Sequence, residues 1–235
     1  MSFLKHFVNI LFPKICLSCR CDLEAERDHP LCLRCERELI MIEFPYCRLC
    51  GAYLKGGGEL CYSCKGKRFN FDFSRSVFIY NLQISSVIKA CKYSSKDYLA
   101  LWMGKIMAER FSYYKEFLEY ESVTYVPVSL AKLRERGFNH SELIASVFSN
   151  LLGLSFIKDA IWSSKTISQL ELSAQERRNN VNGKFKVIRD VFKNKSVIVV
   201  DDVATTMSTL DEISRVIKEA QAKRVCCFTV AREQK

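Results

Sequence analysis

Four Cys-x-x-Cys pairs within the first 64 residues constrain the fold of this chain more than any other feature of its sequence. A Cys-x-x-Cys turn places two thiols on one side of a tight knuckle, and two such knuckles complete a tetrahedral zinc site. Successive pairs are separated by 12, 11 and 10 residues. The spacing therefore predicts two structural Zn²⁺ ions, held by Cys16, Cys19, Cys32, Cys35, Cys47, Cys50, Cys61 and Cys64.

The sequence leaves open how the pairs combine. Sequential ribbons would join the first pair with the second and the third with the fourth, whereas a cross-brace would interleave them, and we favour sequential ribbons. Cys21 follows Cys19 by two residues and could replace a ligand, but we expect it to be a spare thiol. All-thiolate sites leave no open coordination position, so we expect zinc to stabilise the fold and not to catalyse.

The first segment bears on the cellular compartment. Residues 2–12 are apolar at helical spacing, too short to span a bilayer and without a small-x-small cleavage site. We favour a short helix that docks on its own domain over a membrane-surface anchor. We expect a cytoplasmic protein, at most peripheral to the inner face of the membrane, where paired cysteines bind metal.

The pattern changes near residue 70. Strand-like runs alternate with helical patterns; the strands are expected over 76–80, 123–128, 197–202 and 224–231, and the helices over 83–93, 98–118, 140–152 and 209–219. Strands separated by helices of this length indicate crossover connections and a mostly parallel sheet. The prediction is an α/β domain over 71–235, with helices on both faces of the sheet, preceded by a small zinc-ribbon domain over 1–70.

Residues 197–210 are the most informative stretch of the second domain. Four apolar β-formers lead into Asp201 and Asp202, and a turn rich in hydroxyls then opens a helix. Unpaired N–H groups at a helix N-terminus favour an anion, and carboxylates accept from sugar hydroxyls or hold Mg²⁺. This arrangement suits a phosphorylated sugar. The chain has no Gly-x-x-x-x-Gly-Lys-Ser/Thr motif, which argues against a Walker ATPase.

The segment Asp-Asp-x-x-Thr-Thr-x-x-Thr, starting at Asp201, resembles the phosphoribosyl-pyrophosphate (PRPP) motif of type I phosphoribosyltransferases. With four Cys-x-x-Cys pairs upstream, the chain resembles the ComF family, the competence-associated phosphoribosyltransferase-like proteins of bacteria. The resemblance covers nearly the whole chain. It extends to Lys92-Tyr93, to Val126-Pro127-Val128 followed by the Arg-Glu-Arg-Gly-Phe-Asn-His run over 134–140, and to a Thr-x-x-Gln-x-x-Leu … Glu-Arg-x-x-Asn-Val stretch over 166–181.

The resemblance implies a site at the C-terminal edge of the sheet. Asp201 and Asp202 would contact ribose hydroxyls as the catalytic acid pair, and Mg²⁺ would accompany PRPP. Arg134 and Arg136 would meet the pyrophosphate, because Arg forks match phosphate oxygens. The 5′-phosphate would be wrapped by Val203, Ala204, Thr205, Thr206, Met207, Ser208 and Thr209.

Other polar residues near these motifs have a weaker case. We expect His140 to be a polar residue at a helix start, not a general base. Arg177 and Arg178 are at least as compatible with surface ion pairs as with a site.

Two departures from the family pattern bear on turnover. The family's phosphate loop usually reads Thr-Thr-Gly, and this chain has Met207 at the glycine position. A methionine there would crowd the loop or force another path, unless it points outward from an ordinary helical turn. In addition, Ser163-Ser164-Lys165 replaces an arginine that the family carries ahead of Thr166. These departures put turnover in doubt more than the fold.

Three functions follow as hypotheses. The first is a competence factor that handles or takes up transforming single-stranded DNA in the cytoplasm and carries a PRPP-binding site. The alternative is an active phosphoribosyltransferase that transfers phosphoribose from PRPP to a base or amine in nucleotide salvage or biosynthesis. The third is a small-molecule sensor whose zinc region docks on a protein partner, such as a component of the competence machinery.

The net charge of +10 points to an anionic partner. Residues 1–70 carry 11 basic and 8 acidic residues, a net +3, which leaves +7 for residues 71–235. Eight thiolates and two Zn²⁺ would add −4 and bring the zinc region to about −1. Contacts to a DNA backbone are therefore expected mainly on the second domain.

Overall fold

The computed structural model describes residues 14–24, 26–93, 97–163 and 183–234. The helix expected over 2–12 and the family-like stretch over 166–181, with Arg177 and Arg178, lie outside these residues. Among the residues described, no helix combines the length and the apolar character needed to cross a membrane.

Short elements dominate the cysteine-rich part, and longer strands and helices alternate after it. The helices are α2 (Leu33–Arg37), α3 (Leu82–Tyr93), α4 (Asp97–Phe111), α5 (Leu130–Arg136), α6 (His140–Leu152) and α8 (Ser208–Glu219), with 3₁₀ turns η1 (Tyr62–Cys64) and η2 (Lys115–Glu119). The strands are β1 (Ser74–Ile79), β2 (Ser122–Tyr125), β3 (Ser155–Phe156), β4 (Ile161–Ser163), β5 (Phe185–Val187), β6 (Ser196–Ala204) and β7 (Arg224–Arg232).

The central sheet has five strands in the order β1-β7-β6-β2-β3, and all its neighbouring pairs are parallel. Strands β4 and β5 form a separate antiparallel pair. The expected α/β class with a mostly parallel sheet is confirmed. Because the strands are parallel, their carboxyl ends meet at one edge, where β6 delivers Asp201 and Asp202 and β2 delivers Val126 and Pro127.

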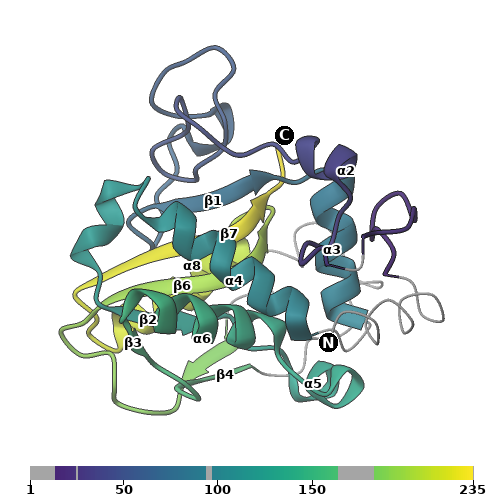
Figure 1. Cartoon of the computed structure of the whole chain (residues 1–235). Coiled ribbons are helices and arrows are strands. Elements are labelled where there is room, and N and C mark those ends of the chain that lie inside the picture. The colour runs from purple at the N-terminus through teal and green to yellow at the C-terminus, as the bar shows by residue number, and fades with distance from the viewer. Residues whose placement is uncertain (1–13, 25, 94–96, 164–182, 235) are drawn as a thin grey trace, which may run out of the picture.

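Helices cover both faces of this sheet, as the sequence predicts. Alternate residues of β6 divide between two buried clusters: Ile198 and Val200 pack with α3, α4 and α6, whereas Val197 and Val199 pack with α8. In Figure 1, α4 and α6 lie across the face of the sheet that is turned toward the viewer. Burial on both faces explains why β6 and β7 read as continuous apolar runs.

One expected helix is shorter than its pattern suggested. The helix expected over 98–118 ends at Phe111, and η2 follows after a break. At the break, Tyr114 leaves helical geometry (φ −103°, ψ 88°). Its buried hydroxyl donates to the backbone carbonyl of Ser76 at 2.9 Å. A helix continued through Tyr114 would not aim this side chain into the core, so tertiary packing overrides the local preference.

The cysteine-rich part packs against the edge of the sheet. Residues 40–42 lie antiparallel to β1, since Ile42 N donates to Val77 O at 2.8 Å and Ile79 N donates to Ile40 O at 2.8 Å. Arg75 of β1 lies between the rings of Tyr46 and Phe73 and pairs with Glu116 at 2.5 Å. The boundary at residue 70 stays a prediction, and the two sides of it share packed surfaces.

Candidate functional site

The 203–209 loop connects β6 to α8 at the carboxyl edge of the sheet. It lines a small hollow together with Asp201 and Leu210. Thr205, Thr206 and Ser208 are exposed there, and the hydroxyls of Thr206 and Ser208 lie 3.1 Å apart. The hydroxyl-rich turn that the sequence singled out is therefore open to a small ligand.

Met207 takes the backbone conformation of a glycine. It lies in the left-handed region (φ 69°, ψ −6°) immediately before the first residue of α8, and its side chain is buried. The suggestion that Met207 could point outward from an ordinary helical turn is wrong. The side chain turns into the apolar cluster beneath the loop, so the backbone keeps a path that a glycine would follow.

The N-terminus of α8 has no side-chain cap within the described part of the chain. The first N–H groups of a helix have no partner inside the helix and are normally satisfied by a cap, water or a ligand. The macrodipole adds partial positive charge at the same point. Ser208, Thr209 and Leu210 thus present an uncapped helix end, of the kind that favours an anion, to the hollow of the 203–209 loop.

The two acids at the end of β6 have different surroundings. Asp201 borders this hollow and accepts a hydrogen bond from Ser141 Oγ at 2.9 Å. Asp202 pairs with Lys92 Nζ and lies 3.1 Å from His140 Nε2. The two carboxylates stay close, with an oxygen of each within 4.8 Å of the other, but they have different partners.

These neighbours act on the two carboxylates in opposite directions. Burial and the adjacent Asp202 carboxylate raise the pKa of Asp201 to about 6. Burial works in the same direction on Asp202, but the hydrogen bond with His140 and the charge of Lys92 outweigh it and hold the pKa of Asp202 well below its usual range. Asp202 is therefore an ionised carboxylate whose charge is balanced by Lys92, whereas Asp201 lines the hollow of the 203–209 loop.

A second, larger hollow lies beside the first and shares Asp201 and Thr209 with it. Its wall is basic, and its lining includes Lys92, Lys132, Arg136, His140 and Lys184. Val126, Pro127 and Val128 from the end of β2 form part of the same wall. Two neighbouring hollows that share Asp201 and Thr209 offer polar groups to a ligand with two separated polar ends.

The two arginines of the Arg-Glu-Arg run lie differently. They end α5, which Gly137 terminates in the left-handed conformation (φ 80°), and Asn139 then caps α6 by accepting from Ser141 N at 3.1 Å. Arg136 lines the larger hollow and lies over the Tyr93 ring at 5.1 Å. Arg134 is exposed and does not belong to the lining.

Several residues of this wall have no local sequence pattern that predicts a role at the site. In the sequence, Lys92 and Tyr93 stand out only as a family-like dipeptide. His140 opens α6, as expected, and in addition contacts Asp202. Lys132 and Lys184 carried no signal, because each is one lysine among many in the sequence. Topology brings all of them to the carboxyl edge of the sheet.

The cysteines gather in two groups that correspond to sequential ribbons. One group contains Cys47, Cys50, Cys61 and Cys64, and the other contains Cys16, Cys19, Cys21 and Cys32; within each, the sulfur atoms lie within 4.8 Å of one another. All-sulfur sets of four suit tetrahedral Zn²⁺. We call residues 14–37 the first ribbon and residues 45–65 the second ribbon.

The first group differs from the expected set in one position, and the choice of its fourth ligand stays a prediction. Cys21, expected to be a spare thiol, stands in the compact set, and the Cys21 sulfur lies 3.4 Å from that of Cys19. Cys35, expected as the fourth ligand, lies outside that set, although its buried thiol still interacts with those of Cys19, Cys32 and Cys16. Five thiols therefore surround a site that needs four, because the tight turn after Cys19 brings Cys21 back toward the knuckle.

Comparisons with known proteins agree with this arrangement. The family profile described as "Double zinc ribbon domain" matches residues 7–65. Competence protein F of Haemophilus influenzae is 27% identical over 92% of this chain and 96% of its own length. The DNA utilization protein YhgH of Escherichia coli K12 is 25% identical over 92% and 96%, and Competence protein ComFC of Streptococcus pneumoniae is 24% identical over 92% and 88%.

Solved structures similar to this chain include two enzymes that handle phosphoribosyl groups by name. The glutamine phosphoribosylpyrophosphate amidotransferase of Bacillus subtilis is 21% identical, with a TM-score of 0.39, over 55% of this chain and 25% of its own. The purine phosphoribosyltransferase of Pyrococcus horikoshii is 18% identical, with a TM-score of 0.36, over 57% and 85%. The fold assignment for this chain rests on its own parallel sheet.

Proposed function

The chain belongs to the ComF family, and we propose that it is a competence factor that handles incoming single-stranded DNA and binds a phosphorylated ribose. The observation that carries the ribose site is the junction of three features. Asp201 lines two neighbouring hollows, of which one contains the uncapped N-terminus of α8 and the other has a basic wall. A 5′-phosphate suits the first hollow, ribose hydroxyls suit Asp201, and a pyrophosphate suits the basic wall.

The proposed role in competence and DNA handling is supported by the names of the relatives. Two of them are named as competence proteins and one as a DNA utilization protein, and each aligns over nearly its whole length with this chain. The excess positive charge lies on residues 71–235, where a single-stranded phosphate backbone would find it. We therefore propose that the DNA contacts residues 71–235 and that the protein acts in the cytoplasm. The role proposed for the two ribbons is to stabilise the fold.

We propose that Mg²⁺ enters with PRPP. Mg²⁺ is usually held by one or two carboxylates together with substrate phosphates. The oxygens of Asp201 and Asp202 and a ring nitrogen of His140 lie within 4.8 Å of one another. Since Lys92 already neutralises Asp202, Asp201 is the residue that would hold the ion, and the ion would offset the charge of a leaving pyrophosphate.

The ribose site is tested by calorimetric titration of the zinc-loaded chain with ribose 5-phosphate and with PRPP plus Mg²⁺. Asp201→Asn removes the charged acceptor between the hollows and is expected to weaken both ligands about 10- to 100-fold, because a hydrogen bond to a charged group contributes roughly 1.5–3 kcal/mol. Asp190→Asn, at an exposed acid of a turn, is the matched control. Equal affinities for the two variants would contradict the assignment of Asp201.

The DNA contact is tested by fluorescence anisotropy with a labelled single-stranded oligonucleotide. Binding through phosphates should weaken steeply as salt rises. Binding that is insensitive to salt would argue against a backbone contact, and the same oligonucleotide with saturating PRPP shows whether the two ligands exclude each other.

A second candidate, phosphoribosyl transfer, is favoured by one observation: the larger hollow has space for an acceptor beside a basic wall. Release of pyrophosphate from PRPP and Mg²⁺ in the presence of a panel of bases and amines tests it. Release that disappears with Asp201→Asn supports transfer. No release from any acceptor, with PRPP still bound, supports a binding role alone.

A further inference from the structure

We propose that Arg232 is the positioning residue of the 203–209 loop: it holds two carbonyl groups at the start of the loop and thereby turns the neighbouring N–H groups toward the phosphate. The inference rests on the proposed phosphate site and deepens it. Arg232 lines neither hollow. A side chain without access to the ligand would therefore control how tightly the loop binds a phosphate.

The guanidinium of Arg232 binds the backbone at the start of the loop. Only 6% of the residue is exposed, and its Nη1 donates to the carbonyl oxygens of Ala204, at 3.1 Å, and of Thr205. Nη1 also donates to the carbonyl oxygen of Glu233 at 2.8 Å. The N–H of Glu233 in turn donates to the Ala204 oxygen at 3.0 Å. Two successive peptide groups of the loop are therefore fixed from the side of β7.

Fixed carbonyls also fix the donors that face the ligand. The peptide bonds after Ala204 and Thr205 are trans, and a trans peptide points its N–H opposite to its C=O. The N–H groups of Thr205 and Thr206 thus point away from Arg232, and both residues line the hollow of the loop. Among the described residues, neither N–H has a hydrogen-bond partner. Backbone donors left open in this way are normally satisfied by water or a ligand.

Arg232 also places a buried positive charge at the loop. In the described part of the chain, no carboxylate lies within ion-pair distance of its guanidinium, and its Nε has no hydrogen-bond partner. Burying a cation beside carbonyl oxygens alone is unfavourable. A phosphate in the loop would bring negative charge close to it, so one residue would both orient the donors and favour an anion.

The sheet holds the backbone of Arg232 in place. Strand β7 lies between β1 and β6, and Arg232 is in register with Ala204 of β6. On the other side, Tyr80 N donates to Arg232 O at 2.8 Å. A side chain on a strand inside a sheet is placed more precisely than one on a loop. The position of the loop start is therefore set by the sheet through this side chain.

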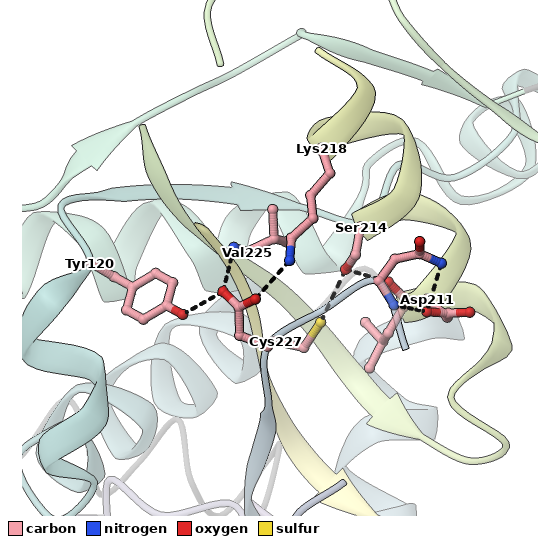
Figure 2. A network of polar contacts seen from close by, with 9 residues as sticks. Tyr120, Asp211, Ser214, Lys218, Val225 and Cys227 are labelled. Atoms are coloured by element: carbon pink, nitrogen blue, oxygen red, sulfur yellow. Dashed lines mark hydrogen bonds and ion pairs between the residues drawn. The ribbon is translucent and has the colours of Figure 1, made fainter. Parts of the chain in front are cut away.

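The helix that follows the loop has anchors of its own. The backbone N–H and the side-chain amide of Asn70 both donate to Asp211 in the first turn of α8. Near the end of α8, Lys218 donates to Asp72 at 2.7 Å. Figure 2 shows these contacts along α8. Loss of the Arg232 side chain should therefore loosen the start of the loop and leave α8 in place.

Calorimetric titration of the zinc-loaded full chain with ribose 5-phosphate tests this role. Arg232→Met removes the charge and the donors and is expected to weaken binding about 10- to 100-fold, because N–H groups that donate to a charged phosphate lose their alignment. Arg232→Lys keeps the charge and one donor group, so it should bind only about 3- to 10-fold more weakly than the wild type. Arg224→Met, at the exposed opposite end of the same strand, is the matched control and should bind as the wild type does.

A second measurement distinguishes positioning from a general loss of stability. Amide nitrogen relaxation in the ligand-free protein reports the order of the backbone on the picosecond to nanosecond timescale. Arg232→Met should lower the order parameters of residues 204–206 and leave those of α8 unchanged. A variant that only destabilised the fold would have a lower melting temperature and unchanged order in the loop. If circular dichroism and zinc content show that Arg232→Met does not fold, Arg232→Lys supplies both measurements with a smaller effect.

The outcomes separate the inference from the proposed function. If the Arg232 variants that fold bind ribose 5-phosphate as tightly as the wild type, or keep the order of residues 204–206, Arg232 is not the positioning residue. Equal weakening by Arg224→Met would show a general effect of the strand and overturn the inference as well. If ribose 5-phosphate does not bind the wild type, the proposed phosphate site is wrong, and the relaxation measurement still decides whether Arg232 holds the loop.

Discussion

Met207 shows how one side chain can replace a glycine without changing the path of the main chain. A left-handed conformation costs a non-glycine residue roughly 1–2 kcal/mol. The burial of the methionine side chain offsets that cost, because large-to-alanine changes of a buried methionine typically cost 2–5 kcal/mol. Met207, which in the sequence argues against a phosphate loop, therefore anchors the loop by packing into the buried apolar cluster.

We predict that Met207→Gly lowers the free energy of unfolding by about 1–3 kcal/mol, since relief of the strained backbone only partly offsets the lost burial. Affinity for ribose 5-phosphate should stay within about twofold, because the backbone already follows the glycine path. Urea denaturation and calorimetric titration measure the two effects. A gain in affinity of tenfold or more would show instead that the methionine crowds the ligand.

Asp201 and Asp202 are neighbours in the sequence but have different surroundings in the structure. From the sequence, Asp201 and Asp202 looked equivalent, and the resemblance assigned both to ribose hydroxyls. The surroundings divide them: Lys92 and His140 engage Asp202, whereas Asp201 borders both hollows. Removal of one partner from a buried ion pair is strongly destabilising, so variants of Asp202 report on folding first and on the ligand second.

At the scale of elements, the knuckle at residues 47–51 docks on the edge strand of the sheet. Ser74 N donates to Leu49 O at 2.7 Å, and Arg75 Nη1 donates to Arg48 O at 3.0 Å. Gly51 completes the knuckle with φ 69°, and a Cβ there would lie 2.6 Å from Ser74 O. The close approach of two backbones thus requires glycine at this position.

Gly51 and Gly57 form a matched pair for testing this docking. Gly57 also has a positive φ, of 73°, but nothing lies within 4 Å of the position of its Cβ. We predict that Gly57→Ala costs about 1–2 kcal/mol of stability from backbone strain alone. Gly51→Ala should cost clearly more, on the order of 3 kcal/mol or above, because the methyl group also meets the carbonyl of Ser74. Equal losses in thermal or urea unfolding would contradict the docking.

At the scale of the whole molecule, the ribbons and the α/β part form one packed body. Each ribbon contributes buried cysteines to one of the two clusters that flank the sheet, and residues 40–42 extend its edge. Figure 1 shows the chain of the second ribbon above β1, at this edge of the sheet. Folding of the ribbons and of the sheet is therefore expected to be cooperative.

Zinc removal tests this cooperativity. We predict two zinc ions per chain by elemental analysis, and a single thermal transition in the loaded protein. Chelation should lower the midpoint of that transition by roughly 10 °C or more, because structural zinc contributes folding free energy directly. An unchanged high-temperature transition after chelation would mean that residues 71–235 fold without the ribbons.

The sequence by itself determined which local units form. The Cys-x-x-Cys spacing indicated two ribbons, and the alternation of apolar strands with amphipathic helices indicated a parallel sheet with helices on both faces. The hydroxyl-rich turn after Asp202 marked the loop before α8. These features depend on residues close together in the chain, where periodicity, ligand spacing and turn chemistry act directly.

Only the tertiary structure decided which residues meet across long sequence distances. It set Lys92 and His140 against Asp202, gathered the basic wall, brought Cys21 and not Cys35 into the compact thiol group, and joined Arg232 to the carbonyls of Ala204 and Thr205 in the 203–209 loop. Such contacts arise from how the strands are ordered and how the ribbons dock, and a single lysine or arginine carries no local signal of its distant partner. Local physics therefore defined the parts of the site, and packing defined how they work together.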